Sequence, residues 1–395
     1  MSLEGKYKEA SMLPSERNQV SIIALIAMFR MFGLFALLPV LSIYASNLKH
    51  ATPIFIGLSV GAYGLTQALF QIPFGLISDR IGRKPVICIG LIIFIMGCLV
   101  AANSESIFGV VFGRLLQGAG AISSTLSALL TDLTRKEIRT KSMAIFGAGI
   151  GCSFLLSLIF GPIISSYFGV RSLFFISAFV SLIAMSLLAL IPSEARRLDK
   201  DTPKDLRNVF KLDLLINDLH VYFLHLILTM MFVIVPFVIT KELNIPLIDH
   251  WKIYISSLLI SLVFTIPLIL SDDKRKERMS FLLPVLLLLI SQLMLVIFDS
   301  SVILVIMCLT VFFVGFNYME ASLPARISIM ADEELRGASL GVFSSFQFLG
   351  AFSGGLLGGW LIGIFPPQEA MFFPVLIIGL WLIFTIFFKG SKLIK

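Results

Sequence analysis

Long apolar runs alternate with short polar breaks along the whole chain of 395 residues. A helix needs about 20 apolar residues to cross the hydrocarbon core of a bilayer, and each run is about that long. The expected helices cover residues 20–45, 54–77, 85–102, 108–131, 142–167, 172–191, 218–239, 251–271, 279–298, 301–325, 337–363 and 370–388. The pattern therefore predicts an all-α membrane protein with twelve transmembrane helices.

The polar stretch that begins at Pro192 divides the runs into two sets of six. The expected units are a segment at 1–19, an N-terminal six-helix bundle at 20–191, a linker at 192–217, a C-terminal six-helix bundle at 218–388 and a tail at 389–395. In the linker, Leu206, Val209 and Phe210 follow helical spacing among basic residues. This spacing predicts a short helix on the membrane surface.

The two halves are related in sequence. The run Ser-Met-Ala-Ile-Phe146 matches Ser-Leu-Gly-Val-Phe343, and Leu-Ile-Ser-Asp79 matches Ile-Leu-Ser-Asp272. Two parallel repeats of six helices are typical of secondary transporters, in which the substrate cavity lies between the repeats near the midplane. We therefore expect a central cavity between the two bundles.

The composition excludes several classes of protein. Hydrophobic residues make up 57% of the chain and charged residues 14%, whereas soluble domains carry about 25% charge. The cysteines lie singly within apolar runs, which argues against a metal set or a disulfide framework. With no nucleophile–base pair and no phosphate loop, we expect no enzyme activity and no cofactor, with a proton gradient as the energy source.

Basic residues are distributed unevenly between the two sides of the predicted bundles. Most of the 31 Lys and Arg residues fall in loops on the side of both termini, and the other side carries only Lys49, Arg171, Lys241 and Lys252. Basic loops stay in the cytoplasm, so both termini are predicted to be cytoplasmic. The asymmetry also explains the net charge of +7 without a nucleic-acid partner.

A densely charged loop joins the second and third runs. Its charged and small positions are Gly75, Asp79, Arg80, Gly82, Arg83 and Lys84. Charges this dense cannot lie in hydrocarbon, so the loop is expected at a membrane surface, where Gly82 lets the chain reverse. Asp79 lies at the negative end of its own helix and needs a positive partner. We predict a latch between helices.

Two arginines lie within apolar runs, where a guanidinium is costly unless it meets polar groups. Arg114 stands in the sequence Arg-Leu-Leu-Gln117-Gly, and two roles remain open for it: a residue of the transport cavity, or a structural centre of hydrogen bonds to carbonyls. Arg30 is expected either to face the cavity or to pair with Glu320 across the two halves.

The tenth run carries Glu320, which we expect to be the only carboxylate deep in any span. Asn317 lies three residues before it and therefore shares its helix face. A carboxyl away from water can exchange a proton near neutral pH, so Glu320 is a candidate for proton coupling or for contact with a cationic substrate. The alternative is a structural ion pair with an arginine.

Other polar and aromatic residues are candidates for the cavity wall. His225 lies within the seventh run and could titrate, although packing is the commoner role of such a histidine. Gln67 and Gln347 would supply hydrogen bonds, and Phe316 an aromatic surface. In the fifth run, the small or helix-weakening residues expected to allow close helix packing are Gly147, Gly151, Gly161 and Pro162.

These motifs resemble those of the major facilitator superfamily of secondary transporters. The stretch from Gly75 to Lys84 resembles its G-x-L-x-D-R-x-G-R-K signature, and Arg114 to Gly118 resembles its R-x-x-Q-G motif. Gly161-Pro162 resembles the glycine-rich motif of its antiporters, but Ile163, Ile164 and Ser165 depart from that pattern. The whole chain is similar to the drug:proton antiporter branch and, within it, to the YajR transporters, without their C-terminal cytoplasmic domain.

The resemblance implies roles for several residues. In relatives, the arginine at the position of Arg114 is linked to proton coupling. Asp79, Arg83 and Asp132 would form a relay on the cytoplasmic face, with Asp79 near the start of the eleventh helix. The resemblance implies that this latch closes the cytoplasmic side and favours the outward-open state, so that breaking it shifts the population inward.

The expected function is proton-coupled export of a small, amphipathic molecule across a bacterial inner membrane. The alternatives are a transporter of a specific metabolite or siderophore, in either direction, and a transport-inactive membrane sensor. The expected partners are the small-molecule substrate, protons and the lipid bilayer, and the protein is expected to be a monomer.

Overall fold

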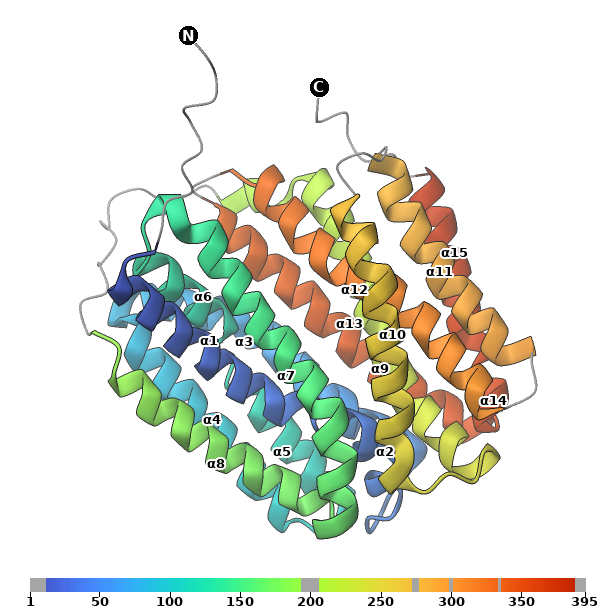
Figure 1. Cartoon of the computed structure of the whole chain (residues 1–395). Coiled ribbons are helices and arrows are strands. Elements are labelled where there is room, and N and C mark those ends of the chain that lie inside the picture. The colour runs from blue at the N-terminus through green and yellow to red at the C-terminus, as the bar shows by residue number, and fades with distance from the viewer. Residues whose placement is uncertain (1–11, 193–205, 272–276, 298–300, 333–334, 388–395) are drawn as a thin grey trace.

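The structure is a computed structural model that describes residues 12–192, 206–271, 277–297, 301–332 and 335–387. Within these residues it consists of helices and their connections, and twelve helical segments are long and apolar enough to cross a membrane. The predicted all-α architecture is confirmed (Figure 1). The predicted tail, the first eleven residues, much of the linker and Asp272 lie outside the described residues.

The N-terminal bundle holds the first six spans. Its helices are α1 (Pro14–Phe35), α2 (Leu38–Ser46), α3 (Pro53–Ile81), α4 (Arg83–Asn103), α5 (Ile107–Ala119), α6 (Ser123–Asp132), α7 (Arg139–Phe168) and α8 (Val170–Ala189), with the 3-10 turn η2 (Lys136–Ile138) before α7.

The C-terminal bundle holds the other six. Its elements are η3 (Leu206–Phe210), α9 (Leu212–Phe237), the π turn η4 (Val238–Glu242), η5 (Leu247–Asp249), α10 (His250–Leu270), α11 (Glu277–Ile297), α12 (Val302–Met330), α13 (Arg336–Ile364), α14 (Pro367–Ala370) and α15 (Phe372–Phe387).

Two runs that we expected as single helices are broken. The first breaks between α1 and α2, and the fourth breaks between α5 and α6 at Gly120. A side chain at Gly120 would lie 2.3 Å from the Gly90 carbonyl oxygen of α4, so only glycine allows this approach. The seventh span also begins earlier than predicted, at Leu212, which places Asp218 inside α9.

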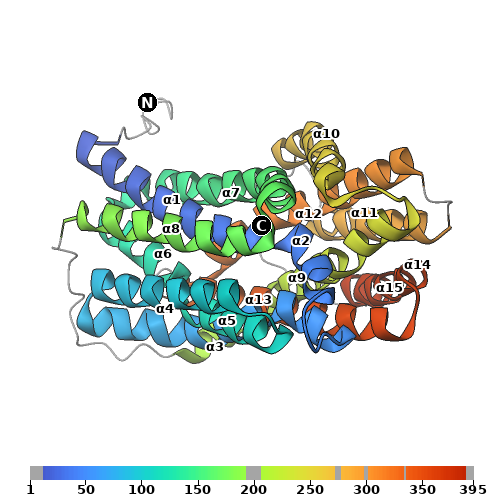
Figure 2. The same ribbon diagram turned by 90° about the horizontal axis from the view of Figure 1, so that it is seen from below.

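The bundles meet mainly at the end of the molecule that lies away from the chain termini. There α2 packs on α9, and α7 packs on α10 and η5. Figure 1 shows α7 and α10 converging at this lower end and separating toward the termini, and Figure 2 shows the same end from below. We call the two ends the termini end and the far end; the bundles are closed at the far end.

Helices α3 and α13 form the closest contact between the bundles. A side chain at Gly57 would lie 2.1 Å from the Gly355 carbonyl oxygen, and one at Gly359 would lie 2.6 Å from the Gly57 Cα. Without side chains at these positions the backbones approach directly, as in other packed transmembrane helices. These residues lie toward the far end, where they add to its closure.

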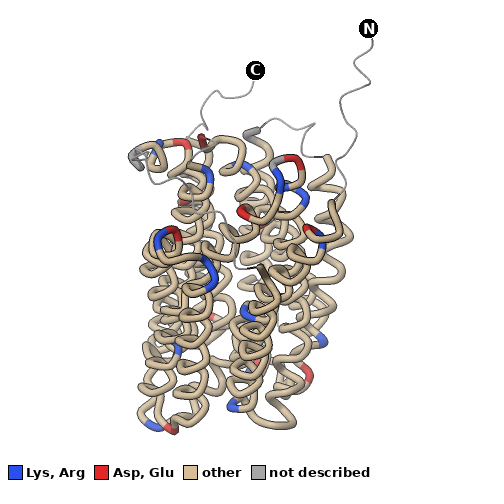
Figure 3. Tube along the Cα trace, turned by 90° about the vertical axis from the view of Figure 1, so that its left-hand side faces the viewer, with Lys and Arg blue, Asp and Glu red and all other residues tan. Residues whose placement is uncertain are grey.

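Charged residues gather at the termini end and become sparse in the middle of the bundles (Figure 3). This distribution fits the predicted cytoplasmic orientation of the termini, which remains a prediction. The predicted linker helix corresponds in part to η3, a 3-10 helix. Val209 of η3 is buried and packs with Leu335 and Val342, whereas Phe210 is exposed, so η3 packs onto the C-terminal bundle.

Candidate functional site

Arg30 of α1 forms the centre of a polar cluster inside the N-terminal bundle, where it is only 1% exposed. Its guanidinium donates to the Tyr63 hydroxyl and, at 3.1 Å, to Gln67 Oε1. The carbonyls of Gln117 and Gly120, at the break between α5 and α6, accept at 3.3 and 3.1 Å. The helix break thus supplies free carbonyl oxygens that compensate the buried cation.

Arg114 lies beside this cluster and is fully buried. Its guanidinium donates to the carbonyls of Ser59 and Val60 at 3.1 and 3.5 Å, and to Gln117 Oε1 at 2.7 Å. The Tyr63 ring lies 5.1 Å from its charged carbon. Of the two roles left open by the sequence, the geometry favours a structural centre of hydrogen bonds. An arginine held this way stays charged.

A second polar cluster joins three helices of the C-terminal bundle, with His225 on α9, Glu320 on α12 and Gln347 on α13. The Gln347 amide nitrogen lies 3.2 Å from Glu320 Oε1 and 2.9 Å from His225 Nε2. His225 Nε2 lies 3.6 Å from Glu320 Oε2. The carbonyl of Val221 is 3.2 Å from His225 Nδ1. We call these three residues the α9–α12–α13 cluster.

The hydrogen bonds around His225 assign its proton. With Nδ1 donating to the Val221 carbonyl, Nε2 is left as the acceptor of the Gln347 amide. A second proton on the ring would therefore lie on Nε2, directed at the Glu320 carboxylate. Among the described atoms, Glu320 Oε2 is buried without a hydrogen-bond partner. The cluster can therefore accept either a proton or a cationic group.

Several predicted cavity residues do not join this cluster. Gln67 and Gln117 are fully buried in the N-terminal bundle. Asn317 donates to Ser261 of α10 at 3.2 Å, so it does not share the partners of Glu320. The predicted pairing of Arg30 with Glu320 is wrong in this conformation, because each has its own partners within its own bundle.

An aromatic layer closes the space between the bundles on the far side of the cluster. Phe154 of α7 lies 6.4 Å from Phe313 and 6.5 Å from Phe316, both on α12, measured between ring centroids. Phe316 also packs against the His225 ring at 5.7 Å. Glu320 lies one helical turn from Phe316 toward the termini end, and its side chain is 42% exposed.

The glycines of α7 show where this space opens. Gly147 and Gly151 lie on the α7 face of Phe154, on its termini side. A side chain at either glycine would meet no described atom within 4 Å, whereas one at Gly161 would lie 2.3 Å from the Ala36 carbonyl oxygen. Close packing was predicted for all four of these fifth-run residues, and Gly161 and the buried Pro162 do pack closely. The prediction is wrong for Gly147 and Gly151, which line open space at the termini end.

The charged loop between α3 and α4 lies at the termini end. Arg83 forms ion pairs with Asp79 and, at 3.0 Å, with Asp132 of α6, so the structure brings the three implied relay residues together. Gly82 has a φ of +103°, which explains the glycine. Lys84 donates to the Ile191 carbonyl at 2.6 Å.

The latch is not closed onto α13. Among the described contacts of Asp79, none reaches the first turn of α13, which is consistent with bundles that are apart at this end. A side chain at Gly75 would meet Ser124 only at 3.5 Å, an ordinary contact distance, and Arg80 is exposed. The latch role stays a prediction.

Asp218 is a buried carboxylate that we did not single out from the sequence. We expected Glu320 to be the only acid deep in a span, but Asp218 of α9 is 1% exposed and lies within the seventh span. Its position near the end of an apolar run made it look like an interfacial residue. The signal that could have found it is its spacing of seven residues from His225, which places both on one helix face.

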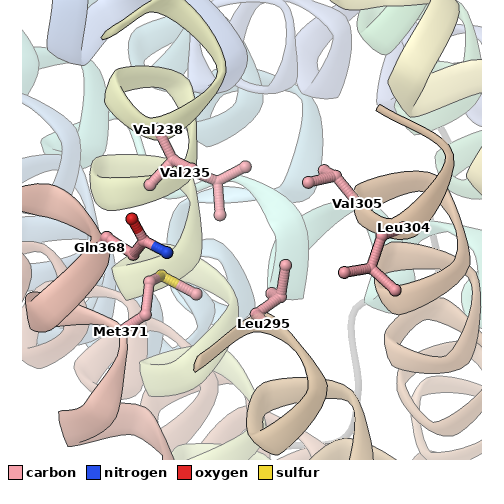
Figure 4. Close-up of a pocket in the computed structure, with 7 residues that line it drawn as sticks. All are labelled: Val235, Val238, Leu295, Leu304, Val305, Gln368 and Met371. Carbon is pink, nitrogen blue, oxygen red and sulfur yellow. The ribbon is translucent and has the colours of Figure 1, made fainter. Parts of the chain in front are cut away.

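A small apolar pocket elsewhere in the C-terminal bundle is separate from these clusters (Figure 4). Its lining residues are Val235, Val238, Leu295, Leu304, Val305, Gln368 and Met371. Gln368 is its one polar side chain, and it offers no charged group to a ligand. We assign the pocket to packing between α9, α11, α12 and α14.

Two bundles of six spans, which are closed against each other at the far end and hold a polar cluster that is partly exposed toward the termini end, define a secondary transporter. The sequence comparison agrees: residues 23–354 match the Major Facilitator Superfamily, and the chain belongs to this family. It is therefore a multi-pass protein of the bacterial inner membrane and not an enzyme.

Relatives of known sequence support this assignment. The chain is 37% identical to the inner membrane transport protein YajR of Escherichia coli over 87% of this chain and 77% of that protein. It is 27% identical to multidrug resistance protein 2 of Bacillus subtilis, over 87% and 89% of the two chains. The fold matches a D-xylose-proton symporter with a TM-score of 0.77 and 15% identity, covering 96% of this chain and all of the other.

Proposed function

We propose that the protein couples proton movement to the export of a small amphipathic molecule, with a cationic group as the feature bound at Glu320. The observation that carries this proposal is the α9–α12–α13 cluster. In it a carboxylate lies beside a histidine nitrogen at 3.6 Å and is reachable from the open termini end. A carboxylate of this kind binds either a proton or an organic cation, and competition between the two couples their movements.

The surroundings of the cluster support an amphipathic substrate. The rings of Phe154, Phe313 and Phe316 form an apolar surface next to the partly exposed carboxylate of Glu320. The similarity to a protein named for multidrug resistance points in the same direction. The proton gradient is an adequate energy source, since moving one charge through 100 mV supplies about 2.3 kcal/mol.

Transport would proceed by rocking of the two bundles about the central site. In the conformation described here, substrate enters from the termini end, which we predict to be cytoplasmic, and displaces the proton from Glu320. In the opposite conformation the cluster opens at the far end, where protonation of Glu320 releases the substrate. The aromatic layer around Phe154 must separate during this change.

Everted membrane vesicles with an imposed pH gradient test the proposal. A pH-sensitive dye reports proton release while lipophilic cations such as tetraphenylphosphonium, weak acids and siderophores are added one at a time. We expect a cation-induced response that disappears in Glu320→Gln and persists in Glu369→Gln, a matched change at an exposed residue of α14. An unchanged dye response in Glu320→Gln would refute the coupling role. If no compound produced a dye response, a transporter of one specific metabolite would be favoured.

A further inference from the structure

Asp218 shares with Glu320 a buried carboxylate oxygen that has no hydrogen-bond partner among the described atoms, but it is far more buried than Glu320, whose side chain is 42% exposed. The residue is 1% exposed, and its Oδ1 is buried without a partner among the described atoms. A bare carboxylate in such a place is very costly, because neither solvent nor a counter-charge compensates it. The protonated, neutral carboxyl avoids that cost.

The basic residues on and beside the helices that pack against α9 contact partners other than Asp218. Lys211, just before α9, pairs with Asp332 at 2.9 Å. Arg326 of α12 lies over the Phe281 ring of α11, at 4.3 Å from its centroid. His220 stacks on the same ring and accepts a hydrogen bond from Trp381 of α15.

The helical position of Asp218 separates it from that group. His220 lies two residues further along α9, which is about 200° round the helix, so Arg326 and its aromatic neighbours are on the opposite face. Other charged residues on α9 and on the helices that pack against it are Asp213 on α9 itself, Arg336 at the exposed start of α13, and Glu320 on α12. None of them forms a described ion pair with Asp218.

We infer that Asp218 is a second proton-binding carboxyl of this transporter, which holds its proton in the conformation open at the termini end and releases it in the other conformation. The inference rests on the proposed proton coupling for its role in transport, but the protonation of Asp218 is measurable without it. Only a proton moves, from the carboxyl to water or to the α9–α12–α13 cluster.

The position of α9 provides a means of exchange. Asp218 and His225 lie on one face of this helix, about 10 Å apart along its axis, with Asp218 nearer the termini end. The same helix packs against α2 of the other bundle and against α12 and α13 of its own. Rocking of the bundles must therefore change the surroundings of α9 and, with them, the cost of ionising Asp218.

Infrared difference spectroscopy on the purified full-length protein in nanodiscs tests the protonation directly. At mildly alkaline pH, where exposed carboxyls are ionised, we expect a carbonyl stretch of a protonated carboxyl that shifts in heavy water. The band should disappear in Asp218→Asn, return in Asp218→Glu and persist in Asp213→Asn, the matched control on the same helix. Absence of the band from the unaltered protein, or its survival in Asp218→Asn, would overturn the inference.

Proton flux in the everted vesicles tests the release step. With tetraphenylphosphonium as the probe, we expect Asp218→Asn to slow proton movement at least tenfold while Asp213→Asn leaves it unchanged; a normal rate in Asp218→Asn would overturn release. If Glu320→Gln keeps full coupling while the infrared band still depends on Asp218, the proposed function fails and the protonation of Asp218 stands. If the infrared band does not depend on Asp218 while coupling still depends on Glu320, the protonation of Asp218 is refuted and the proposed function stands.

Discussion

The two bundles treat their buried charges in opposite ways. In the N-terminal bundle, Arg30 and Arg114 are surrounded by carbonyls, a hydroxyl and amides of fixed position, with no carboxylate among the described contacts. In the C-terminal bundle, Asp218 and Glu320 each keep an oxygen without a hydrogen-bond partner, and no described arginine or lysine pairs with either. The first arrangement holds a permanent charge in place, whereas the second allows a charge to appear and disappear.

This difference in partners indicates a structural role for the N-terminal cluster and a proton-exchanging role for the C-terminal cluster. Guanidinium groups do not lose protons at physiological pH, so the N-terminal cluster contributes rigidity. Carboxyl and imidazole groups exchange protons readily, and partners that are incomplete leave both protonation states within reach. We therefore expect substitutions in the N-terminal cluster to affect folding and those in the C-terminal cluster to affect coupling.

The largest effect on stability is expected for Arg114→Met. This change removes the donor for two backbone carbonyls and Gln117, and leaves them buried in an apolar interior. We expect the free energy of unfolding to fall by about 3 kcal/mol. Thermal unfolding in detergent, followed by circular dichroism, measures it. Arg17→Met, at an exposed position of α1, is the control; equal effects of the two would contradict the structural role.

A smaller loss is expected for Arg83→Gln at the termini end. Arg83 is 8% exposed and joins α4 to Asp132 of α6, so its removal leaves an acid with few partners. Hydrogen bonds to charged groups contribute about 2 kcal/mol, which is the expected decrease in the free energy of unfolding. The same thermal assay applies. If Arg83→Lys gave full stability, a point charge would suffice and the forked contacts would not matter.

Glu320→Gln should leave stability within about 1 kcal/mol of the unaltered protein. The amide has nearly the shape of the carboxyl, and its oxygen can still accept from Gln347. Urea unfolding of the two proteins side by side provides the measurement. A loss as large as that of Arg114→Met would show that Glu320 is structural and would remove the contrast between the bundles.

The smallest effect concerns an exposed pair at the far end, where the Lys49 ammonium, 2.6 Å away, holds the pKa of Glu105 below its usual value of 4.5. Because folding lowers this pKa, the pair stabilises the protein above about pH 4.5, and the contribution is lost as the pH falls through the lowered pKa. Exposure keeps the contribution small. The stability difference between the protein and Lys49→Ala, measured against pH, should therefore shrink on acidification; growth would contradict the pairing.

The sequence predicted the twelve spans, the two repeats and the charged loop, because these depend on local composition and spacing. It also supplied all three residues of the α9–α12–α13 cluster. It did not decide whether Arg30 faces the cavity or pairs with Glu320 across the two bundles, and in the structure each of them has its partners within its own bundle. The choice is made by contacts between helices distant in sequence.

Two other features were not predicted from the sequence, because they also depend on contacts between helices distant in sequence. The break at Gly120 depends on its close approach to Gly90 of α4, which no local pattern reveals. Gly147 and Gly161 look alike in sequence, yet one lines open space and the other packs on Ala36. The orientation of a helix face is set by its neighbours, so periodicity alone cannot assign it.

Nitrogen-15 NMR of labelled histidine tests most directly whether Glu320 and His225 exchange a proton. The chain has four histidines, which His→Gln variants assign one at a time. We expect the His225 ring signals to change with pH and to change again in Glu320→Gln, while those of His220, bonded to Trp381, stay the same in that variant. If the His225 signals change neither with pH nor on loss of the Glu320 carboxyl, the proton-exchanging role of the C-terminal bundle is contradicted.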